Sequence, residues 1–267
     1  QMCIRHRKYS DLELARRLAE RGMAGCAIKC HYFDTAARAG LLMEQFPQLD
    51  VAGGVTLNRS VGGVNPDAVE RSAQAGGRMV WFPTLEARAY QRYQHRNDPE
   101  ADLSRFLTVC DEEGELLPQA LEVLDAAARH HMVVGTGHVG AEEGMALVRA
   151  AAERSCTIVL THADNPADCY SLEQQEEAAA LGAYVEHCFF TTFHGRTPIG
   201  EIARQIRAVG CDRVLLTTDF GLLNSLYSDE GMEEYARQLL AEGFSREELE
   251  TMMCRTPRHL LHPEEQD

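Results

Sequence analysis

Polar residues of the kinds that hold metal ions end three apolar stretches of this chain. His138 ends "VVGTGH", His162 ends "IVLTH" and Asp219 ends "LLTTD". Each stretch is rich in β-branched residues and predicts a buried strand. Because the carboxyl ends of parallel strands open on one face of an α/β fold, we expect the three side chains to converge there. Neutral imidazoles and a carboxylate suit zinc or a similar divalent ion, so the pattern predicts a site for one metal ion.

Two further strand ends carry polar residues that could act on a substrate. Lys29 and His31 in "KCH" lie on one face of a predicted strand, because strand side chains alternate. Glu186 and His187 therefore face opposite ways, and we assign Glu186 to the site and His187 to the packing behind it. We predict that Lys29 and Glu186 bind or protonate a substrate and that His31 contacts it. A salt bridge from Lys29 to Asp34 is the structural alternative.

The segment "NRSVGGVNP" joins the next predicted strand to a helix. Its glycine amides lie beside Arg59 and the start of that helix, an arrangement that can bind an anion. Asn58 and Arg59 are therefore predicted to bind substrate. A flexible loop without a ligand is the alternative interpretation.

One pattern repeats along the chain: a short apolar run ends in polar residues and a helical stretch follows. A first helix is expected to begin at Ser10 or Asp11. Strands are expected at 25–33, 51–58, 78–84, 131–140, 157–164, 183–190 and 213–221. Helices are expected near 34–45, 66–76, 117–130, 141–154, 171–181, 198–209, 230–242, 245–253 and 256–261.

Strands that are apolar throughout and alternate with helices indicate a parallel sheet covered on both faces. Seven strands are one short of a closed (β/α)₈ barrel, the TIM barrel. We predict this barrel as a single domain over 1–267. Its first strand is expected upstream of Gln1. An open doubly wound sheet is the second choice, but no G-x-G-x-x-G follows the early strands. The long connection 85–116 is predicted to be an insertion that covers the active face like a lid.

Composition limits the partners of the protein. The 267 residues carry a net charge of −15, which repels phosphate backbones and disfavours nucleic-acid binding. No apolar stretch approaches the roughly 20 residues of a membrane helix. The nine cysteines form no CxxC pair, as in a reduced cytoplasmic protein. The expected partner is a small-molecule substrate, and assembly into a homo-oligomer stays open.

The succession "GTGHVG", "LTHAD" and "TTDFG" resembles the metal-dependent hydrolases of the amidohydrolase superfamily. In that family a histidine on the fifth strand, a histidine on the sixth and an aspartate on the eighth converge on the metal site. With one strand upstream, the resemblance assigns these roles to His138, His162 and Asp219. The ending "CRTPRHLL" also resembles the final helix of these barrels and of TatD-type hydrolases. More narrowly, "LELARRLAERGMAGCAIKCHYFDTAARAG" with "GGVTLNRSVGGVNP" is similar to an uncharacterised amidohydrolase-like branch.

The chain departs from the family pattern at two places. The H-x-H pair that the family carries on its first strand occurs nowhere in the sequence, and His6 in "IRHRK" is not that motif. The fourth strand of the family often provides a bridging lysine or glutamate, whereas "RMVWFPT" provides Trp81 and no ligand. The resemblance therefore implies one divalent metal ion, zinc as the first choice and manganese as the second.

The resemblance implies hydrolysis of an amide, ester or lactone-like bond in a small organic substrate by metal-activated water. Asp219 would accept the proton of that water and return it to the leaving group. A Schiff-base lyase or aldolase that uses Lys29 is the first alternative. A non-catalytic binding protein derived from the hydrolase fold is the second. TatD-type nuclease activity shares the order of ligands, but the acidic composition disfavours it.

Overall fold

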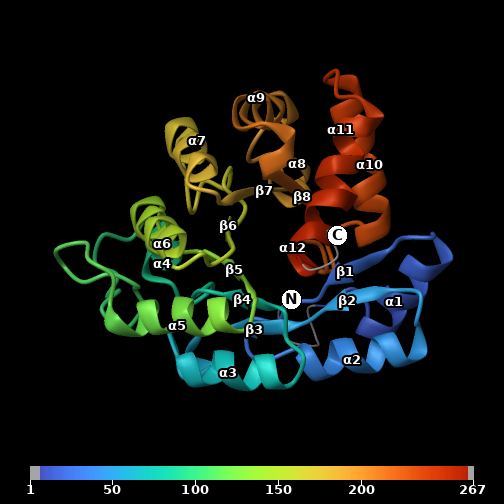
Figure 1. Ribbon diagram of the computed structural model, residues 1–267. Helices are drawn as coiled ribbons and strands as arrows, with labels where there is room; N and C mark the ends of the chain where they lie inside the picture. Colours follow the sequence, from blue (N-terminus) through green and yellow to red (C-terminus); the bar gives the residue numbers. More distant parts are fainter. Residues whose placement is uncertain (1–6, 264–267) are drawn as a thin grey trace.

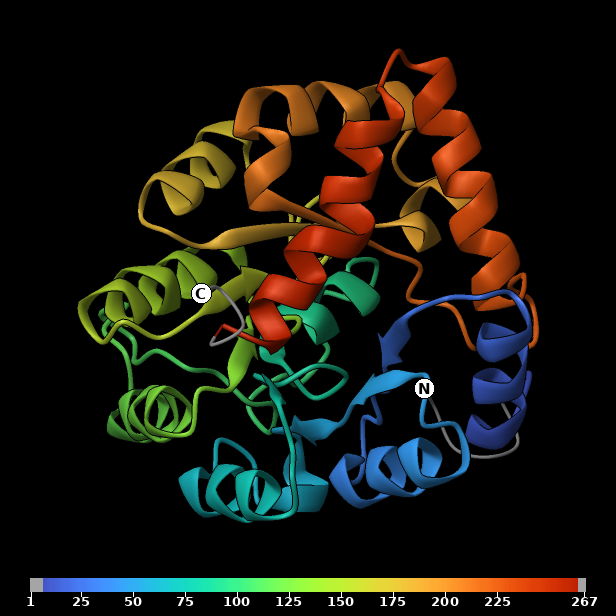
Figure 2. The same cartoon turned by 45° about the vertical axis from the view of Figure 1, so that its right-hand side comes forward.

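The computed structural model describes residues 7–263, and its strands are short, parallel and arranged in chain order. They are β1 (Gly25–Ala27), β2 (Asp50–Ala52), β3 (Gly54–Thr56), β4 (Met79–Trp81), β5 (Val133–Gly135), β6 (Ile158–Leu160), β7 (Tyr184–Cys188) and β8 (Val214–Thr217). Strands β3 to β8 form one six-stranded sheet, and β1 and β2 form a separate pair. The helices surround the strands, as in the predicted TIM barrel (Figure 2).

Every expected strand contains a strand of the structure, and one is divided. The single strand expected at 51–58 pairs backward with β1 over Asp50–Ala52 and forward with β4 over Gly54–Thr56. The break lies at Gly53, where a Cβ atom would come within 2.5 Å of the Thr35 carbonyl oxygen and 2.7 Å of the Ala36 Cα. The start of the next helix thus presses against the backbone at this point, which only glycine tolerates.

The helices fill the gaps between strands at the expected places. They are α1 (Asp11–Glu20), α2 (Ala36–Gln45), α3 (Pro66–Gln74), α4 (Arg88–Gln94), α5 (Pro118–Arg129), α6 (Ala141–Glu153), α7 (Leu172–Ala180), α8 (Phe189–Phe193), α9 (Ile199–Val209), α10 (Ser228–Ala241), α11 (Arg246–Glu250) and α12 (Thr256–Leu261) (Figure 1). Ser10 caps α1 by accepting a hydrogen bond from the Glu13 amide at 3.1 Å. Helices α4 and α8 were not expected. A π-helical turn over Thr251–Arg255 joins α11 to α12.

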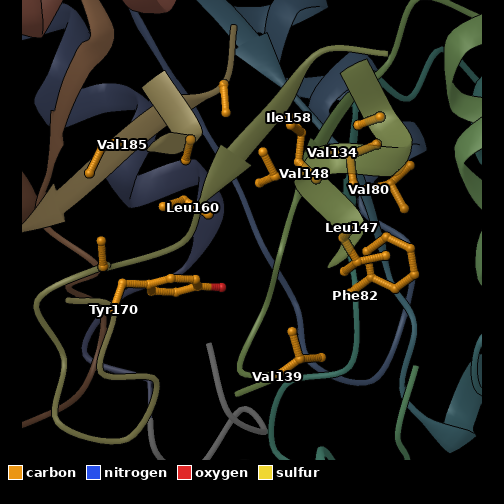
Figure 3. Packing of buried hydrophobic residues seen from close by; sticks show 14 of the residues in the cluster. Val80, Phe82, Val134, Val139, Leu147, Val148, Ile158, Leu160, Tyr170 and Val185 are labelled. Carbon is orange, nitrogen blue, oxygen red and sulfur yellow. The ribbon is translucent and has the colours of Figure 1, made fainter. Parts of the chain in front are cut away.

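The main hydrophobic core lies between the outer face of the sheet and the helices. Val80 of β4, Val134 of β5 and Val185 of β7 belong to it, together with Leu147 and Val148 of α6 (Figure 3). Alternation along each strand sends these side chains outward, so the intervening residues face the barrel axis. Each fully buried aliphatic side chain contributes about 2 kcal/mol, and the strands are thereby fixed at the positions from which they present the site.

The C-terminal helix lies across the amino ends of the strands. Leu260 of α12 packs with Val133 of β5, Val159 of β6 and Tyr184 of β7. Figure 2 shows α12 crossing in front of the strands at this end. Apolar packing therefore covers this end of the barrel, and the carboxyl ends of the strands remain as the face for chemistry.

The chain before α1 is attached to the segment that follows β8. The Lys8 amide donates to the Gly221 carbonyl at 2.8 Å, and its ammonium group donates to the Ser225 carbonyl at 2.6 Å. The Tyr9 ring stacks on Tyr227 with centroids 5.5 Å apart. These contacts bring β8 and its following loop against the part of the chain that leads to β1, which completes the ring of elements.

An ion pair between α1 and α10 secures the same junction, and its loss should destabilise the protein. Arg17 donates two hydrogen bonds to Asp229, at 2.9 and 2.8 Å, and the Asp229 side chain is only 2% exposed. Burial opposes ionisation of Asp229, but the Arg17 hydrogen bonds overcome it and lower its pKa. Asp229→Asn should therefore reduce the free energy of unfolding by about 2 kcal/mol in urea at neutral pH.

The same ion pair makes the free energy of unfolding depend on pH. Because the pKa of folded Asp229 lies below the unfolded value of about 3.9, its stabilisation is complete above that pH and is lost as the pH falls through the folded value. The difference between wild type and Asp229→Asn should therefore shrink in acid. The exposed pair Arg237–Glu234 within α10 provides the control, since Glu234→Gln should change stability far less. Equal losses in the two variants would contradict this role for Asp229.

The connection between β4 and α5 is long and folds over the carboxyl ends of the strands. It contains α4, and it is closed at its base by hydrogen bonds between Arg88 and Leu107 and between Leu107 and Glu86. Glu143 of α6 accepts a hydrogen bond from the Val109 amide at 2.9 Å and so anchors its second half. Within residues 7–263, no helix is both long and apolar enough to cross a membrane.

Candidate functional site

Two histidines meet at the carboxyl ends of β5 and β6. The rings of His138 and His162 are buried, with centroids 4.7 Å apart. His138 follows Gly137, whose φ of +69° turns the chain after β5, and its amide donates to the Pro83 carbonyl at 2.9 Å. The Tyr90 ring from α4 also lies beside His138, with ring centroids 4.9 Å apart. The sequence prediction that His138 and His162 lie together at the mouth of the barrel agrees with this geometry.

Asp168 holds the His162 ring. Nδ1 of His162 forms an ion pair with a carboxylate oxygen of Asp168, and both side chains are buried. Burial opposes protonation of His162, but the Asp168 charge raises its pKa to about 9. This contact engages Nδ1, so a ligand would have to bind through Nε2. Because the pKa is about 9, both ring nitrogens carry protons at neutral pH, and a metal ion would displace the proton on Nε2. An imidazole fixed through its other nitrogen by a carboxylate is typical of metal sites.

His31 is oriented in the same way by Thr84. Its Nδ1 lies 2.7 Å from the Thr84 hydroxyl, and its ring centroid lies 5.9 Å from that of His138. Asn58 fixes both partners, because its amide group donates to the His31 carbonyl at 2.8 Å and to the Thr84 hydroxyl at 2.7 Å. The Asn58 carbonyl oxygen accepts from the Thr84 amide at 2.9 Å. Asn58, predicted to bind substrate, therefore positions His31 and Thr84.

Burial and neighbouring charges keep two of the three imidazoles neutral. Burial lowers the pKa of His31, and the Lys29 and His162 charges lower it further. Burial also lowers the pKa of His138 well below its usual value, with added effects of His162 and Lys29. A metal ion binds neutral imidazole, so both rings are in the required form at neutral pH.

Glu186 links β7 to the strands on both sides of it. Its carboxylate accepts a hydrogen bond from the His162 amide at 3.1 Å and one from the Thr217 hydroxyl at 2.8 Å. Glu186 was predicted to bind or protonate substrate, and in the structure both of its oxygens accept hydrogen bonds from these strand ends. His187 lies behind the barrel as expected, fully buried, with Nδ1 3.0 Å from Asp164.

The charges of Asp219 and Lys29 act on the site histidines. Asp219 adopts a φ of +50° and His162 a φ of +33°, left-handed conformations that non-glycine residues adopt at a cost of about 1–3 kcal/mol. The Asp219 charge helps to raise the pKa of His162, after the larger effect of Asp168. The Lys29 ammonium group lies 5.6 Å from the centroid of the Trp81 ring, on the inner side of β4.

The predicted anion cradle beside Arg59 already holds an anion from the protein. The Arg59 amide donates to the Glu86 carboxylate at 2.6 Å, and the guanidinium lies 3.9 Å from the same group. The Arg59 side chain is half exposed. Arg59 therefore binds the Glu86 carboxylate, whereas the Gly62 and Gly63 amides donate to carbonyls of the loop itself. Substrate binding by Arg59 stays a prediction.

The residues at the mouth match the donor types of a divalent metal site. His31 and His138 are neutral imidazoles, and Nδ1 of buried His138 has no hydrogen-bond partner in the part of the chain that the structure describes. In their present positions, however, no three His, Cys, Asp or Glu side chains among residues 7–263 form a group that could hold a metal ion. Binding through His138, His162 and Asp219 thus stays a prediction that requires side-chain movement or further ligands.

A family model described as "Family of unknown function (DUF6282)" matches residues 2–186. This is more than half of the chain and includes His31, Asn58, His138, His162 and Glu186. The chain belongs to the DUF6282 family. No curated protein matches this DUF6282 chain.

Solved structures of enzymes with low sequence identity share the fold of this DUF6282 protein. The phosphotriesterase homology protein from Escherichia coli, complexed with phosphate in its active site, is 16% identical with a TM-score of 0.60 over 92% of this chain and 87% of that one. An amidohydrolase from Pseudomonas aeruginosa is 13% identical with a TM-score of 0.58 over 94% and 82%. An amidohydrolase from Burkholderia multivorans with bound HEPES is 17% identical with a TM-score of 0.58 over 95% and 88%. At these identities the likeness shows the fold, which confirms the barrel that the sequence predicts.

The sequence assigns no site role to two residues that lie at the candidate site. Asp168 lies in the loop after β6, and Tyr90 belongs to α4 in the long connection. Thr84 ends the strand expected at 78–84, so the rule applied to His138 places it at the mouth, but without a role. Nothing in the sequence pattern indicates that Asp168 folds back on His162 or that Tyr90 reaches His138.

Proposed function

We propose that this protein is a metal-dependent hydrolase of the amidohydrolase type that acts on an amide, ester or lactone-like bond of a small organic substrate. The observation that carries the proposal is the group of three imidazoles at the carboxyl ends of the strands, in which His138 and His162 are buried and His31 is partly buried. Two of them are fixed through Nδ1 and keep Nε2 for a ligand. The fold shared with amidohydrolases supports the same conclusion.

His138, His162 and Asp219 would hold the metal ion, with zinc as the first choice and manganese as the second. When bound, such an ion polarises a carbonyl oxygen and lowers the pKa of water. Asp219 would take a proton from the attacking water and deliver it to the leaving group. Asp168 and Glu186 keep His162 in place, and the Tyr90 ring covers His138 and limits the access of bulk water.

Metal loading followed by a substrate survey tests the proposal. The purified protein is stripped with a chelator, reloaded with zinc or manganese and freed of excess metal, and its metal content is measured by mass spectrometry. We expect about one ion per chain and metal-dependent cleavage of at least one class in a panel of aryl esters, lactones and amides. Metal content at trace level together with no cleavage in any class would refute it.

Asp168→Asn should weaken metal binding without unfolding the protein. The asparagine keeps the size of the side chain but removes the charge that fixes His162 and raises its pKa. Loss of such a supporting carboxylate lowers metal affinity by about 10- to 100-fold. Competition with a chromophoric chelator measures this affinity, and Asp125→Asn, an exposed aspartate that pairs with Arg154 on the outside of the barrel, is the control. Unchanged affinity in Asp168→Asn would contradict the assigned role.

A further inference from the structure

The geometry points to Trp81 as the floor of the site, a side chain that closes the barrel beneath the histidines and restricts the substrates to those with a short acyl group or a compact ring. This inference rests on the proposed hydrolase function and adds a size limit to its substrate class. Trp81 is not one of the predicted metal ligands, so its role would be in specificity.

Trp81 faces the axis of the barrel. Its chain neighbours Val80 and Phe82 belong to the core between the sheet and the helices, so alternation along the strand turns the indole inward. Trp81 is only 7% exposed. The single tryptophan of the chain therefore lies inside the barrel.

A glycine in the adjacent strand leaves room for the indole. Gly135 of β5 is the register partner of Trp81. A Cβ atom at Gly135 would lie 2.6 Å from Cδ1 of the indole and 2.9 Å from the Thr161 hydroxyl, and only glycine leaves this space. The indole thus lies across β5 and comes close to Thr161, which directly precedes His162 in the chain.

Lys29 approaches the indole from the pair of strands β1 and β2. It follows β1, and its ammonium group lies 5.6 Å from the centroid of the Trp81 ring, a cation–π contact. Further along the same two segments, Nδ1 of His31 lies 2.7 Å from the Thr84 hydroxyl. Because parallel strands run toward the mouth, His31 and Thr84 lie nearer to it than Lys29 and Trp81 do. The indole therefore lies beneath the layer of the imidazoles.

Apolar side chains fill the barrel on the other side of the indole. Val133 precedes Gly135 by two positions and lies on the same face of β5. It packs with Val159, Tyr184 and Leu260 at the amino ends of the strands. A substrate cannot extend along the axis toward this end, so the space for it lies between the indole and the long connection that covers the mouth.

The position of the indole limits the part of a substrate that enters the barrel. Successive layers of inward side chains are about 7 Å apart, and a contact distance of about 3.5–4 Å uses half of this. With the reacting carbonyl carbon at the imidazoles, the remaining space accepts about two or three further carbon atoms along the axis. A longer acyl chain would collide with the indole, whereas the leaving group can point out of the mouth.

Trp81→Ala, with Phe82→Ala as its matched control, tests the floor without metal or turnover. Both variants remove a buried ring, but Phe82 faces the outer core, so only the first should open space beneath the imidazoles. Indole is the probe, and nuclear magnetic resonance of isotope-labelled histidines reports where it binds. We expect saturable binding of indole to Trp81→Ala that shifts the ring signals of His31 and His138. Neither Phe82→Ala nor the wild type should show these shifts.

Trp81→Leu with benzene as the probe is the same test at a smaller loss of volume, and circular dichroism shows which variants are folded. This variant also tests the acyl length in the metal-loaded protein. The acetyl, butyryl and octanoyl members of the class that the survey finds cleaved are compared by kcat/KM. The wild type should favour acetyl over octanoyl by about a hundredfold or more, and Trp81→Leu should reduce that preference about tenfold. Phe82→Leu should leave it unchanged.

A folded Trp81 variant in which the probe does not shift the signals of the site histidines would overturn the inference. Equal cleavage of acetyl and octanoyl compounds by the wild type, or the same preference in Trp81→Leu, would overturn it as well and would retain the hydrolase. Shifts of the site histidines without metal-dependent cleavage in any class would do the reverse, since Trp81 would then be the floor of a site that binds a compact ligand.

Discussion

His162→Ala is expected to lower metal-dependent hydrolysis by about a thousandfold and to reduce the metal content far below that of the wild type. The reason is that His162 occupies the centre of the site. Its ring lies 4.7 Å from that of His138, its Nδ1 contacts Asp168, and its amide is bound by Glu186. Removal of the ring deletes a ligand and leaves the Asp168 carboxylate buried without its ion-pair partner.

The control is His130→Ala, at the opposite end of the barrel. His130 is an exposed residue at the end of α5, where its ring pairs with Glu70. This variant should keep the metal content and the rate of the wild type. Circular dichroism of both variants separates loss of the site from loss of the fold. Full metal content and full activity in His162→Ala would exclude the proposed role of this histidine.

Gly137→Ala is expected to destabilise the protein by about 3 kcal/mol or more and to displace His138. Gly137 has a φ of +69°, and a Cβ atom there would lie 2.2 Å from the Phe82 carbonyl oxygen and 2.6 Å from that of Pro83. The same Pro83 carbonyl accepts the amide hydrogen of His138. The methyl group must therefore push apart the ends of β4 and β5, from which the site is built. Urea unfolding measures the loss of stability.

Gly182→Ala isolates the conformational part of that effect. Gly182 also has a positive φ, +94°, but a Cβ atom would meet no heavy atom within 4 Å. Its cost should be about 1 kcal/mol, that of placing alanine in a left-handed conformation without a collision. If the two variants were equally stable, close packing of β4 against Gly137 would not be what positions His138.

The positions of strands and site histidines could be predicted because both follow from local patterns. Apolar runs of β-branched residues fix the strands, and parallel strands place their last residues on one face, as His138 and His162 show. The alternation of side chains along a strand predicted that Glu186 and His187 face opposite ways. In the structure Glu186 accepts a hydrogen bond from the His162 amide, whereas His187 contacts Asp164. The role of Glu186 could not be read in this way, because it depends on which groups of β6 and β8 lie opposite its carboxylate.

The remaining features depend on contacts between distant parts of the chain. The break at Gly53 follows from the approach of Thr35, 18 positions earlier in the sequence, which no local pattern contains. Asp168 reaches His162 because the loop between them turns twice, with Asp168 and Cys169 donating to the Asn165 carbonyl. Residues in long connections, such as Tyr90 in α4, are placed by tertiary packing, and helix propensity over so short a segment gives little signal.

The strands form a pair and a separate six-stranded sheet, and the candidate site lies across the boundary between these two groups of strands. Lys29 and His31 follow β1, which packs with α1 and α2 around its own cluster of Leu14, Leu18 and Val51, whereas the other two imidazoles belong to the larger sheet. Across this boundary, Asn58 and Thr84 of the larger group hold His31 through side-chain hydrogen bonds and not through backbone pairing between strands. A bound substrate that touches both groups of strands would therefore connect them through its own contacts, in addition to these side-chain hydrogen bonds.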